Sequence, residues 1–149
     1  MKRIFLIFFL LSNFSCFYNP TGPAETELNK EFDLKFGKTA VIGEEKLYIT
    51  FKDVIEDSRC PIGYRCFVAG NGAVLLKIEK DGAALLIDTV NTTSDPHSLN
   101  YLNYKITLKN LNPYPVADSL IKKGDYIASL FVEKSFILNI DKHTPVDGF

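Results

Sequence analysis

Few residues of this 149-residue chain could hold a metal ion or perform catalysis, because the sequence contains only three cysteines and two histidines. A structural zinc site needs about four ligands, and one cysteine pair with the distant His97 and His143 is a poor match for one. A hydrolytic triad would need one of the same histidines. The sequence also lacks a Gly-x-Ser-x-Gly nucleophile elbow, a P-loop and a His-Glu-x-x-His motif. We therefore expect a non-enzymatic protein without a metal or cofactor.

Long apolar runs are absent except at the N-terminus. There, Lys2 and Arg3 precede an apolar run at residues 4–11 that is too short to span a bilayer. This pattern is typical of a secretory signal peptide. The small residue Ser15 followed by Cys16 resembles the lipobox of bacterial lipoproteins. The resemblance implies removal of residues 1–15, acylation of Cys16 and anchoring in the bacterial cell envelope, at the outer membrane.

An ordinary signal peptide cleaved nearby is the alternative, and it would leave Cys16 as an odd free thiol in an exported protein. Removal of residues 1–15 would also take away Lys2 and Arg3, so the formal charge would change from −1 to −3. A mildly acidic chain has no electrostatic attraction for nucleic acid. The expected partners are therefore the membrane, through the lipid anchor, and an envelope or extracellular protein.

The rest of the chain divides into three parts. Residues 16–30 contain Pro20, Gly22 and Pro23 among polar residues and predict a flexible tether. Residues 31–135 predict one folded domain. Residues 136–149 are expected to form a C-terminal strand or tail.

The hydrophobic pattern of the predicted domain has a period of two, which indicates strands with one face on a core. Short strands separated by turns predict an antiparallel β-sandwich, immunoglobulin-like, with about seven strands. The only helical candidate is a short turn within 116–124. The alternating sets are Phe32, Leu34 and Phe36; Leu47, Ile49 and Phe51; Tyr104, Ile106 and Leu108; and Tyr126, Ala128, Leu130 and Val132.

One hairpin is predicted in detail. Asp81-Gly82 stands between two apolar runs, as in a two-residue hairpin turn in which both residues adopt positive φ. The register that follows places Lys80 opposite Ala83, Ile78 opposite Leu85, Leu76 opposite Ile87 and Val74 opposite Thr89. In this register one face is buried, formed by Val74, Leu76, Ile78, Leu85 and Ile87.

Cys60 and Cys66 are separated by five residues, whereas thioredoxin-like redox motifs have two residues between their cysteines. Export would place the pair in an oxidising compartment, where a disulfide is the default. Pro61 and Gly63 supply a bend that permits closure. We expect a disulfide that holds a loop.

The segment "EDSRCP" (residues 56–61), followed by Cys66 and "AGN" (residues 69–71), resembles a family of small, largely uncharacterised bacterial secreted proteins and lipoproteins. The resemblance extends over about residues 32–134. It implies a compact all-β lipoprotein domain and supplies no known activity. Val68 stands where that family usually has Trp, which argues against an aromatic binding platform at this position.

The charged and polar residues Glu56, Asp57, Arg59 and Asn71 mark a candidate binding loop. Two carboxylates and a guanidinium could bind an ion or an anionic ligand. Alternatively, Asp57 could cap loop N–H groups while Arg59 ties the loop to a neighbouring strand. The leading hypothesis is a lipid-anchored binding or structural module. The alternatives are a protease-inhibitor-like module that uses the disulfide loop, and an envelope enzyme with an unrecognised site.

Overall fold

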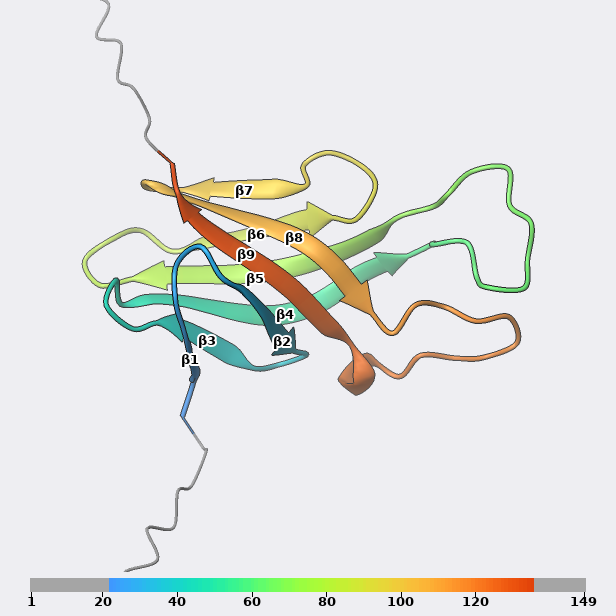
Figure 1. Cartoon of the computed structure of the whole chain (residues 1–149), viewed down its shortest axis with the longest axis horizontal. Helices are drawn as coiled ribbons and strands as arrows, with labels where there is room; N and C mark the ends of the chain where they lie inside the picture. Colours follow the sequence, from blue (N-terminus) through green and yellow to red (C-terminus); the bar gives the residue numbers. More distant parts are fainter. Residues whose placement is uncertain (1–21, 136–149) are drawn as a thin grey trace, which may run out of the picture.

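The computed structural model describes residues 22–135, which form two β-sheets packed face to face (Figure 1). The expected signal peptide, Cys16 and the expected C-terminal strand or tail at 136–149 lie outside the described residues. Among the described residues there is no helix with the length and apolar character needed to cross a membrane.

One sheet has the order β1-β3-β4-β5-β6 and the other has the order β2-β9-β8-β7. All neighbouring strands are antiparallel except β1 and β3, which are parallel. The strands are β1 (Ala24–Thr26), β2 (Glu31–Lys35), β3 (Thr39–Ile42), β4 (Leu47–Asp57), β5 (Gly72–Lys80), β6 (Leu86–Asn91), β7 (Ser98–Tyr101), β8 (Tyr104–Asn112) and β9 (Ile127–Lys134).

The predicted β-sandwich is confirmed, with nine strands in the described residues instead of about seven. Three connections cross between the two sheets, namely β1 to β2, β2 to β3 and β6 to β7. Here β3 to β6 follow one another in one sheet, and β7 to β9 follow one another in the other. Strand β1 lies inside the predicted tether, so the folded domain begins earlier than expected.

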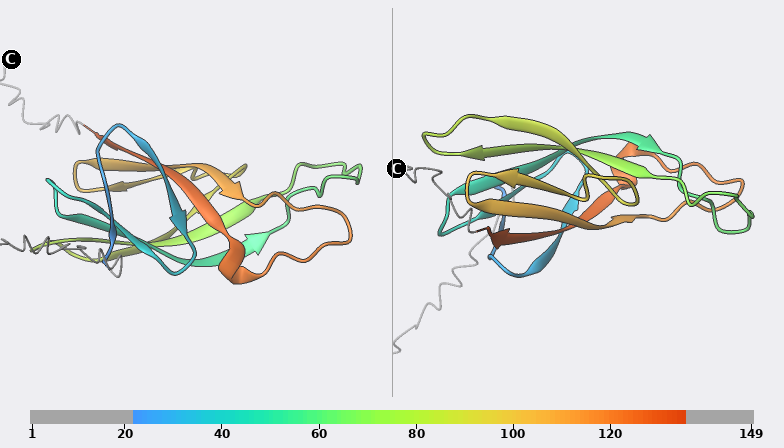
Figure 2. Two further views of the ribbon diagram at one scale, coloured as in Figure 1. Left: turned by 60° about the horizontal axis from the view of Figure 1, so that its bottom comes forward. Right: turned by 90° about the horizontal axis from the view of Figure 1, so that it is seen from above.

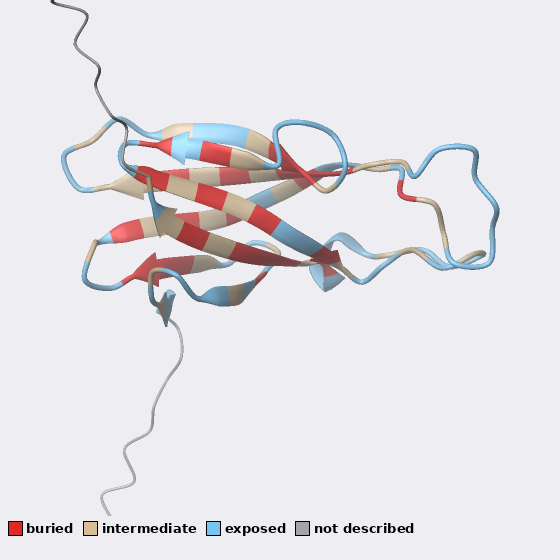
Figure 3. Ribbon diagram, turned by 45° about the horizontal axis from the view of Figure 1, so that its top comes forward, coloured by how far each residue is buried: buried red, intermediate tan, exposed pale blue. Residues whose placement is uncertain are grey.

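The core lies between the two sheets, where buried and exposed residues alternate along the strands (Figure 3). The predicted alternation is confirmed on β4, β8 and β9, and on β2 Leu34 is buried while Phe32 is half-buried. Within the described residues, all members of the core cluster and the apolar residues packed against it fall between Leu28 and Val132, so the chain from Cys16 onward contains each of them. The largest fully buried side chains are Tyr104, Phe51, Leu34, Leu47, Ile49, Leu76, Ile78, Ile106, Leu111, Leu130, Val74 and Val90.

The predicted register of the β5–β6 hairpin is wrong by one residue. Ile78 pairs with Leu86 instead of Leu85, and Ile87 is exposed. The predicted turn needs positive φ at both Asp81 and Gly82, but only Gly82 has it, with φ 75°. The strands therefore pair only from Leu86 onward, and the slip carries the predicted core residues Leu85 and Ile87 to the other side of the sheet. The β5 half of the buried face is confirmed.

The two ends of the sandwich differ. The turns 43–46 and 81–85 lie at the end where the described chain enters and leaves (Figure 1). The opposite end carries two long loops, 58–71 between β4 and β5 and 113–126 between β8 and β9, which project side by side in all views (Figures 1 and 2). The short helix expected within 116–124 does not form. A single 3-10 turn, η1 (Lys123–Asp125), occurs there, and Asp118 has a positive φ of 58°.

Candidate functional site

The loops 58–71 and 113–126, together called the loop pair, are held to each other along their length. The Ile62 N–H donates to the carbonyl of Pro115 at 2.9 Å, and the Ala117 N–H donates to the carbonyl of Ile62 at 2.9 Å. Farther out, the Tyr64 hydroxyl lies 3.2 Å from Oδ1 of Asp118. Segments about 50 residues apart in sequence thus form one projection.

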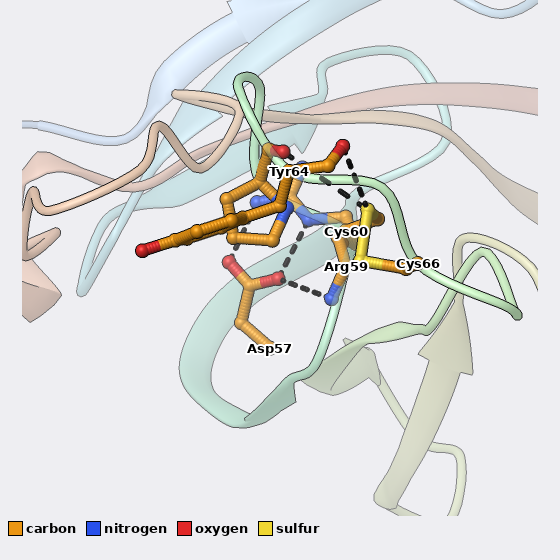
Figure 4. The surroundings of a disulfide bond; sticks show 6 residues. Asp57, Arg59, Cys60, Tyr64 and Cys66 are labelled. Atoms are coloured by element: carbon orange, nitrogen blue, oxygen red, sulfur yellow. Dashed lines mark hydrogen bonds and ion pairs between the residues drawn. A yellow bond between two sulfur atoms is a disulfide. The ribbon is translucent and has the colours of Figure 1, made fainter.

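A disulfide closes the first of these loops, as expected. The Sγ atoms of Cys60 and Cys66 are 2.15 Å apart and the Cα atoms 5.9 Å apart (Figure 4). Below it, the β4–β5 ladder continues into the loop, because the Ser58 N–H donates to the carbonyl of Asn71 at 2.7 Å and the Cys60 N–H donates to the carbonyl of Ala69 at 3.0 Å. The loop therefore extends the sheet and does not leave it as an irregular coil.

The side chain of Arg59 is buried at the base of the loop pair, with 5% of the residue exposed. Its Nε and Nη2 atoms donate to the two carboxylate oxygens of Asp57, each at 2.7 Å (Figure 4). Nη1 donates to the carbonyl of Leu111, and Nη2 also donates to the carbonyl of Pro113 at 3.0 Å. One planar guanidinium therefore joins the end of β4 to the end of β8 and to the start of the second loop.

Tyr126 is the third member of this group of side chains. We call the group of Asp57, Arg59 and Tyr126 the Arg59 knot. The Tyr126 hydroxyl donates to Oδ2 of Asp57 at 2.9 Å. Burial by itself would raise the pKa of Asp57, but the hydrogen bonds from Arg59 and Tyr126 and the charge of Arg59 outweigh it, so the pKa lies below its ordinary value. Burial, and the hydrogen bond to the Asp57 carboxylate, raise the pKa of Tyr126 to about 12. The knot is therefore an ion pair with a neutral phenol over the neutral pH range.

Asn71 fastens the same base to the neighbouring β6–β7 loop. Its Oδ1 accepts hydrogen bonds from the backbone N–H groups of Thr93 at 3.2 Å and Ser94 at 3.4 Å, while its Nδ2 donates to Oδ1 of Asn91 at 2.9 Å. The preceding Gly70 has φ 70°, and a Cβ at that position would lie 1.8 Å from the carbonyl oxygen of Ser58. The "AGN" part of the motif thus serves close backbone packing.

Of the four residues predicted as a binding loop, three are engaged in holding the base together. Arg59 and Asp57 bind each other, and Asn71 binds the β6–β7 loop. Glu56 is exposed and accepts a hydrogen bond from the hydroxyl of Ser58 at 2.6 Å. These contacts agree with the structural interpretation of the motif, because four of the five guanidinium N–H groups of Arg59 bind oxygen atoms of the protein, and its Cζ lies over the ring of Tyr114, 5.0 Å from the centroid.

The outer part of the loop pair is apolar and exposed. Phe67 is fully exposed, at 108%, and Leu120 is 97% exposed. No sequence pattern predicts this surface, although two apolar residues, Phe67 and Val68, directly follow the loop cysteine Cys66. Seven of the eleven large exposed hydrophobic residues in the described part of the chain lie on these two loops, and we call them the tip patch: Ile62, Tyr64, Phe67, Val68, Tyr114, Val116 and Leu120.

Elsewhere in the described residues there is no second candidate site comparable to the loop pair. His97 is exposed in the β6–β7 loop, with Nδ1 3.2 Å from the carbonyl oxygen of Asn91 and Nε2 3.7 Å from Asp95, while His143 lies outside the described residues. Within 22–135, no three His, Cys, Asp or Glu side chains gather as metal ligands would. A shallow hollow of about 830 Å³ lies at the chain-entry end, lined by Glu25, Thr26, Glu27, Leu28, Lys30, Glu31, Phe32, Ile42, Gly43, Glu44 and Glu45.

Known proteins offer no comparison for the tip patch. No protein-family model matches the chain, and neither a curated protein nor a solved structure does so. The geometry combines a buried, hydrogen-bonded base with an apolar, exposed apex. Large exposed apolar patches on otherwise polar surfaces mark sites of interaction.

Proposed function

We propose that this protein is a lipid-anchored, non-enzymatic binding module of the bacterial cell envelope, and that the tip patch is its binding surface. The observation that carries the proposal is the position of Phe67 and Leu120, which are almost fully exposed on two loops that are themselves bonded together. Exposing two such side chains to water is unfavourable by roughly 1.5 to 3 kcal/mol for each compared with burying it. A binding partner that covers them would recover that free energy.

The rigidity of the loop pair supports this role. The disulfide, the Arg59 knot and the Ile62–Val116 bridge restrict both loops before any partner binds. A surface that is ordered in advance loses less conformational entropy on binding than a mobile loop does. The motif residues then act indirectly, by holding the apolar residues in place.

The proposed anchor joins the domain at β1, away from the tip patch. Seven residues separate Cys16 from Ala24, the first residue of β1, so the two lie at most about 29 Å apart. Ala24 is level with Ala40 and, through it, with Ile49. The base of the loop pair at Asp57 is therefore about 26 Å farther along β4, and the tip patch lies beyond that base. In this arrangement the lipid holds one end of the sandwich at the membrane while the tip patch is displayed at the other end (Figure 1).

Two further features support an envelope location. The N-terminal pattern of Lys2 and Arg3, an apolar run and Cys16 resembles an export signal followed by an acylated cysteine. The Cys60–Cys66 disulfide fits an oxidising compartment. Intact-mass analysis of the membrane fraction tests this part. We expect a chain that starts at an acylated Cys16, and an unmodified N-terminus elsewhere would refute the anchor.

A protease-inhibitor-like module is the second candidate. The observation in its favour is the wedge formed by a disulfide-closed loop beside a second loop, with Tyr64 and Arg65 exposed directly before Cys66. An inhibitor of this kind would place the wedge in the cleft of a protease. Incubation of the protein with a panel of serine and cysteine proteases tests it, and no inhibition at micromolar concentrations would remove this candidate.

Site-specific photo-crosslinking in the producing cells tests the tip patch as the binding surface. A photoreactive phenylalanine analogue placed at Val68 should give adducts, because this side chain lies in the tip patch. The matched control places the analogue at Ile87, which is 53% exposed on the outer side of β6. Adducts from Ile87 equal to those from Val68, or none from either, would contradict the proposal.

A further inference from the structure

We infer that the tip patch binds a lipid bilayer with anionic headgroups by shallow insertion of the loop pair. This inference rests on the proposed function, since it takes the tip patch as the binding surface, and it adds the chemical class of the ligand. The contact is separate from the proposed lipid on Cys16, because the loop pair lies at the opposite end of the sandwich (Figure 1).

The shape of the tip favours a fluid apolar phase. Phe67 and Leu120 project from the ends of two different loops, and almost no atom of the protein covers either side chain. A rigid protein partner would need two deep pockets at matching positions to bury both. Acyl chains rearrange around such projections, and burial of apolar side chains at the headgroup boundary drives this kind of attachment.

The backbone of the loop pair limits how deeply it can enter a bilayer. Within the hydrocarbon region every backbone N–H that finds no partner is costly. N–H groups are bonded internally where the two loops meet, whereas those of Phe67 and Leu120 have no acceptor within the described residues, so the backbone stays at the hydrated headgroup level and only the side chains insert. The internal bonds join Cys60 N to Ala69 O, Ile62 N to Pro115 O, Tyr64 N to Pro61 O, Ala117 N to Ile62 O and Ser119 N to Val116 O.

The exposed charges of the loop pair leave an excess of one positive charge, with Arg65, Lys122 and Lys123 against Asp118 and Asp125. Arg65 and Lys122 are exposed cations that make no ion pair with another described residue, whereas Lys123 is paired with Asp53. The acid nearest the apex, Asp118, accepts the hydroxyl of Tyr64. The other acid, Asp125, lies in η1 next to the base. Each cation near an anionic membrane surface favours binding.

Two tyrosines add the amphipathic groups that suit the headgroup region. Tyr64 is 56% exposed and Tyr114 is 44% exposed, and each joins an apolar ring to a polar hydroxyl. Tyrosine is enriched at the level of the headgroups in membrane proteins for this reason. The loop pair thus combines apolar projections, amphipathic rings and cations, which is the composition expected of a segment that enters the boundary between headgroups and acyl chains.

Vesicle co-sedimentation tests the inference with the chain from residue 16 onward carrying Cys16→Ser, which contains the whole core and has no lipid of its own. The probes are vesicles of phosphatidylcholine alone and of three parts phosphatidylcholine to one part phosphatidylglycerol. We expect binding to the anionic vesicles that weakens with added salt. Phe67→Asp with Leu120→Asp should lower the partition coefficient by at least about tenfold, because carboxylates enter the apolar boundary poorly.

The matched control is Ile87→Asp, which is compared with Phe67→Asp alone as the same single change at an exposed apolar residue outside the loop pair, and it should bind as the parent does. Arg65→Glu should weaken binding to anionic vesicles only. Unchanged circular dichroism and unfolding midpoints would show that each variant is folded. Absence of sedimentation with anionic vesicles, or an equal loss from Ile87→Asp, would overturn the inference. Protein adducts from Val68 in cells without vesicle binding would overturn it too, while leaving the proposed function intact.

Discussion

Replacement of Arg59 with Ala tests whether the buried charge at the base of the loop pair is structural. The Arg59 and Asp57 side chains are only 4% and 10% exposed, so solvent screens their interaction weakly. Without the guanidinium, the Asp57 carboxylate would keep the hydroxyl of Tyr126 as its remaining side-chain donor, and the carbonyls of Leu111 and Pro113 would lose theirs. Breaking a buried pair from one side costs about 3 to 5 kcal/mol, and we expect a loss of that size.

The loss should depend on pH in a defined direction. In the parent protein the pKa of Asp57 lies below its ordinary value, so Asp57 contributes stability at neutral pH that is lost only as the pH falls through this lowered pKa. In Arg59→Ala, the side-chain hydrogen bonds and the charge of Arg59 that lower this pKa are lost, so burial outweighs the hydrogen bond from Tyr126 and raises the pKa of Asp57. The variant then takes up a proton more readily than the parent. The difference in unfolding free energy should therefore be smaller at about pH 4 than at pH 7.

Urea unfolding followed by circular dichroism at the two pH values measures both effects. The control is Arg65→Ala, which removes an exposed guanidinium without a described ion pair and should change the unfolding free energy by less than about 0.5 kcal/mol. A loss below about 1 kcal/mol for Arg59→Ala would refute the structural role of the knot. A loss that is equal at both pH values would refute the argument about Asp57.

Three further changes separate the contributions of the disulfide, the loop base and the core. Replacing both Cys60 and Cys66 with Ser should lower the unfolding free energy by about 2 kcal/mol while preserving the β-sheet dichroism; two reactive thiols in the unfolded, unreduced parent would contradict the disulfide. Gly70→Ala should cost more than about 2 kcal/mol in urea unfolding, because its Cβ would lie 1.8 Å from a backbone oxygen. Leu76→Ala should cost about 2 to 5 kcal/mol, but Ile87→Ala less than about 1 kcal/mol, and equal losses would contradict the observed register.

The sequence predicted the strands well because burial on one face of a sheet leaves a period of two in the residues. Leu47, Ile49 and Phe51 alternate with polar residues in the sequence and are fully buried in the structure. The register between strands was harder to predict, because it depends on backbone dihedrals in the turn. Asp81-Gly82 fits more than one turn type, and the backbone excludes the predicted one because Gly82 has a positive φ and Asp81 does not.

The strand order was not predictable from local pattern. Alternation shows that a segment has one buried face, but it does not identify the neighbour of that strand. The pairing of β2 with β9 joins segments about 95 residues apart, and β1 pairs with β3 in parallel although its three residues carry no apolar pattern. Backbone hydrogen bonds along an exposed edge need no particular side chains, so such a strand leaves little signal in the sequence.

The candidate site was predicted in part. The disulfide followed from export and cysteine count, and the role of Arg59 in tying the loop to a neighbouring strand was one of two open interpretations. The tip patch was missed because its members lie outside the strands, where no periodicity marks an exposed face. Phe67 and Leu120 come from different loops, and only the fold places them at one end.

Substitutions at the base and at the apex of the loop pair should affect different properties of this protein. The base residues, such as Arg59 and Gly70, are buried or closely packed, so changes there lower stability and displace both loops together. The apex residues, such as Phe67, contact almost nothing, so changes there should leave folding intact and alter binding alone. A variant set that covers both groups can therefore distinguish a scaffold defect from a binding defect. If apex variants lost stability as base variants do, the apex would be part of the folded core and the tip patch would not be a binding surface.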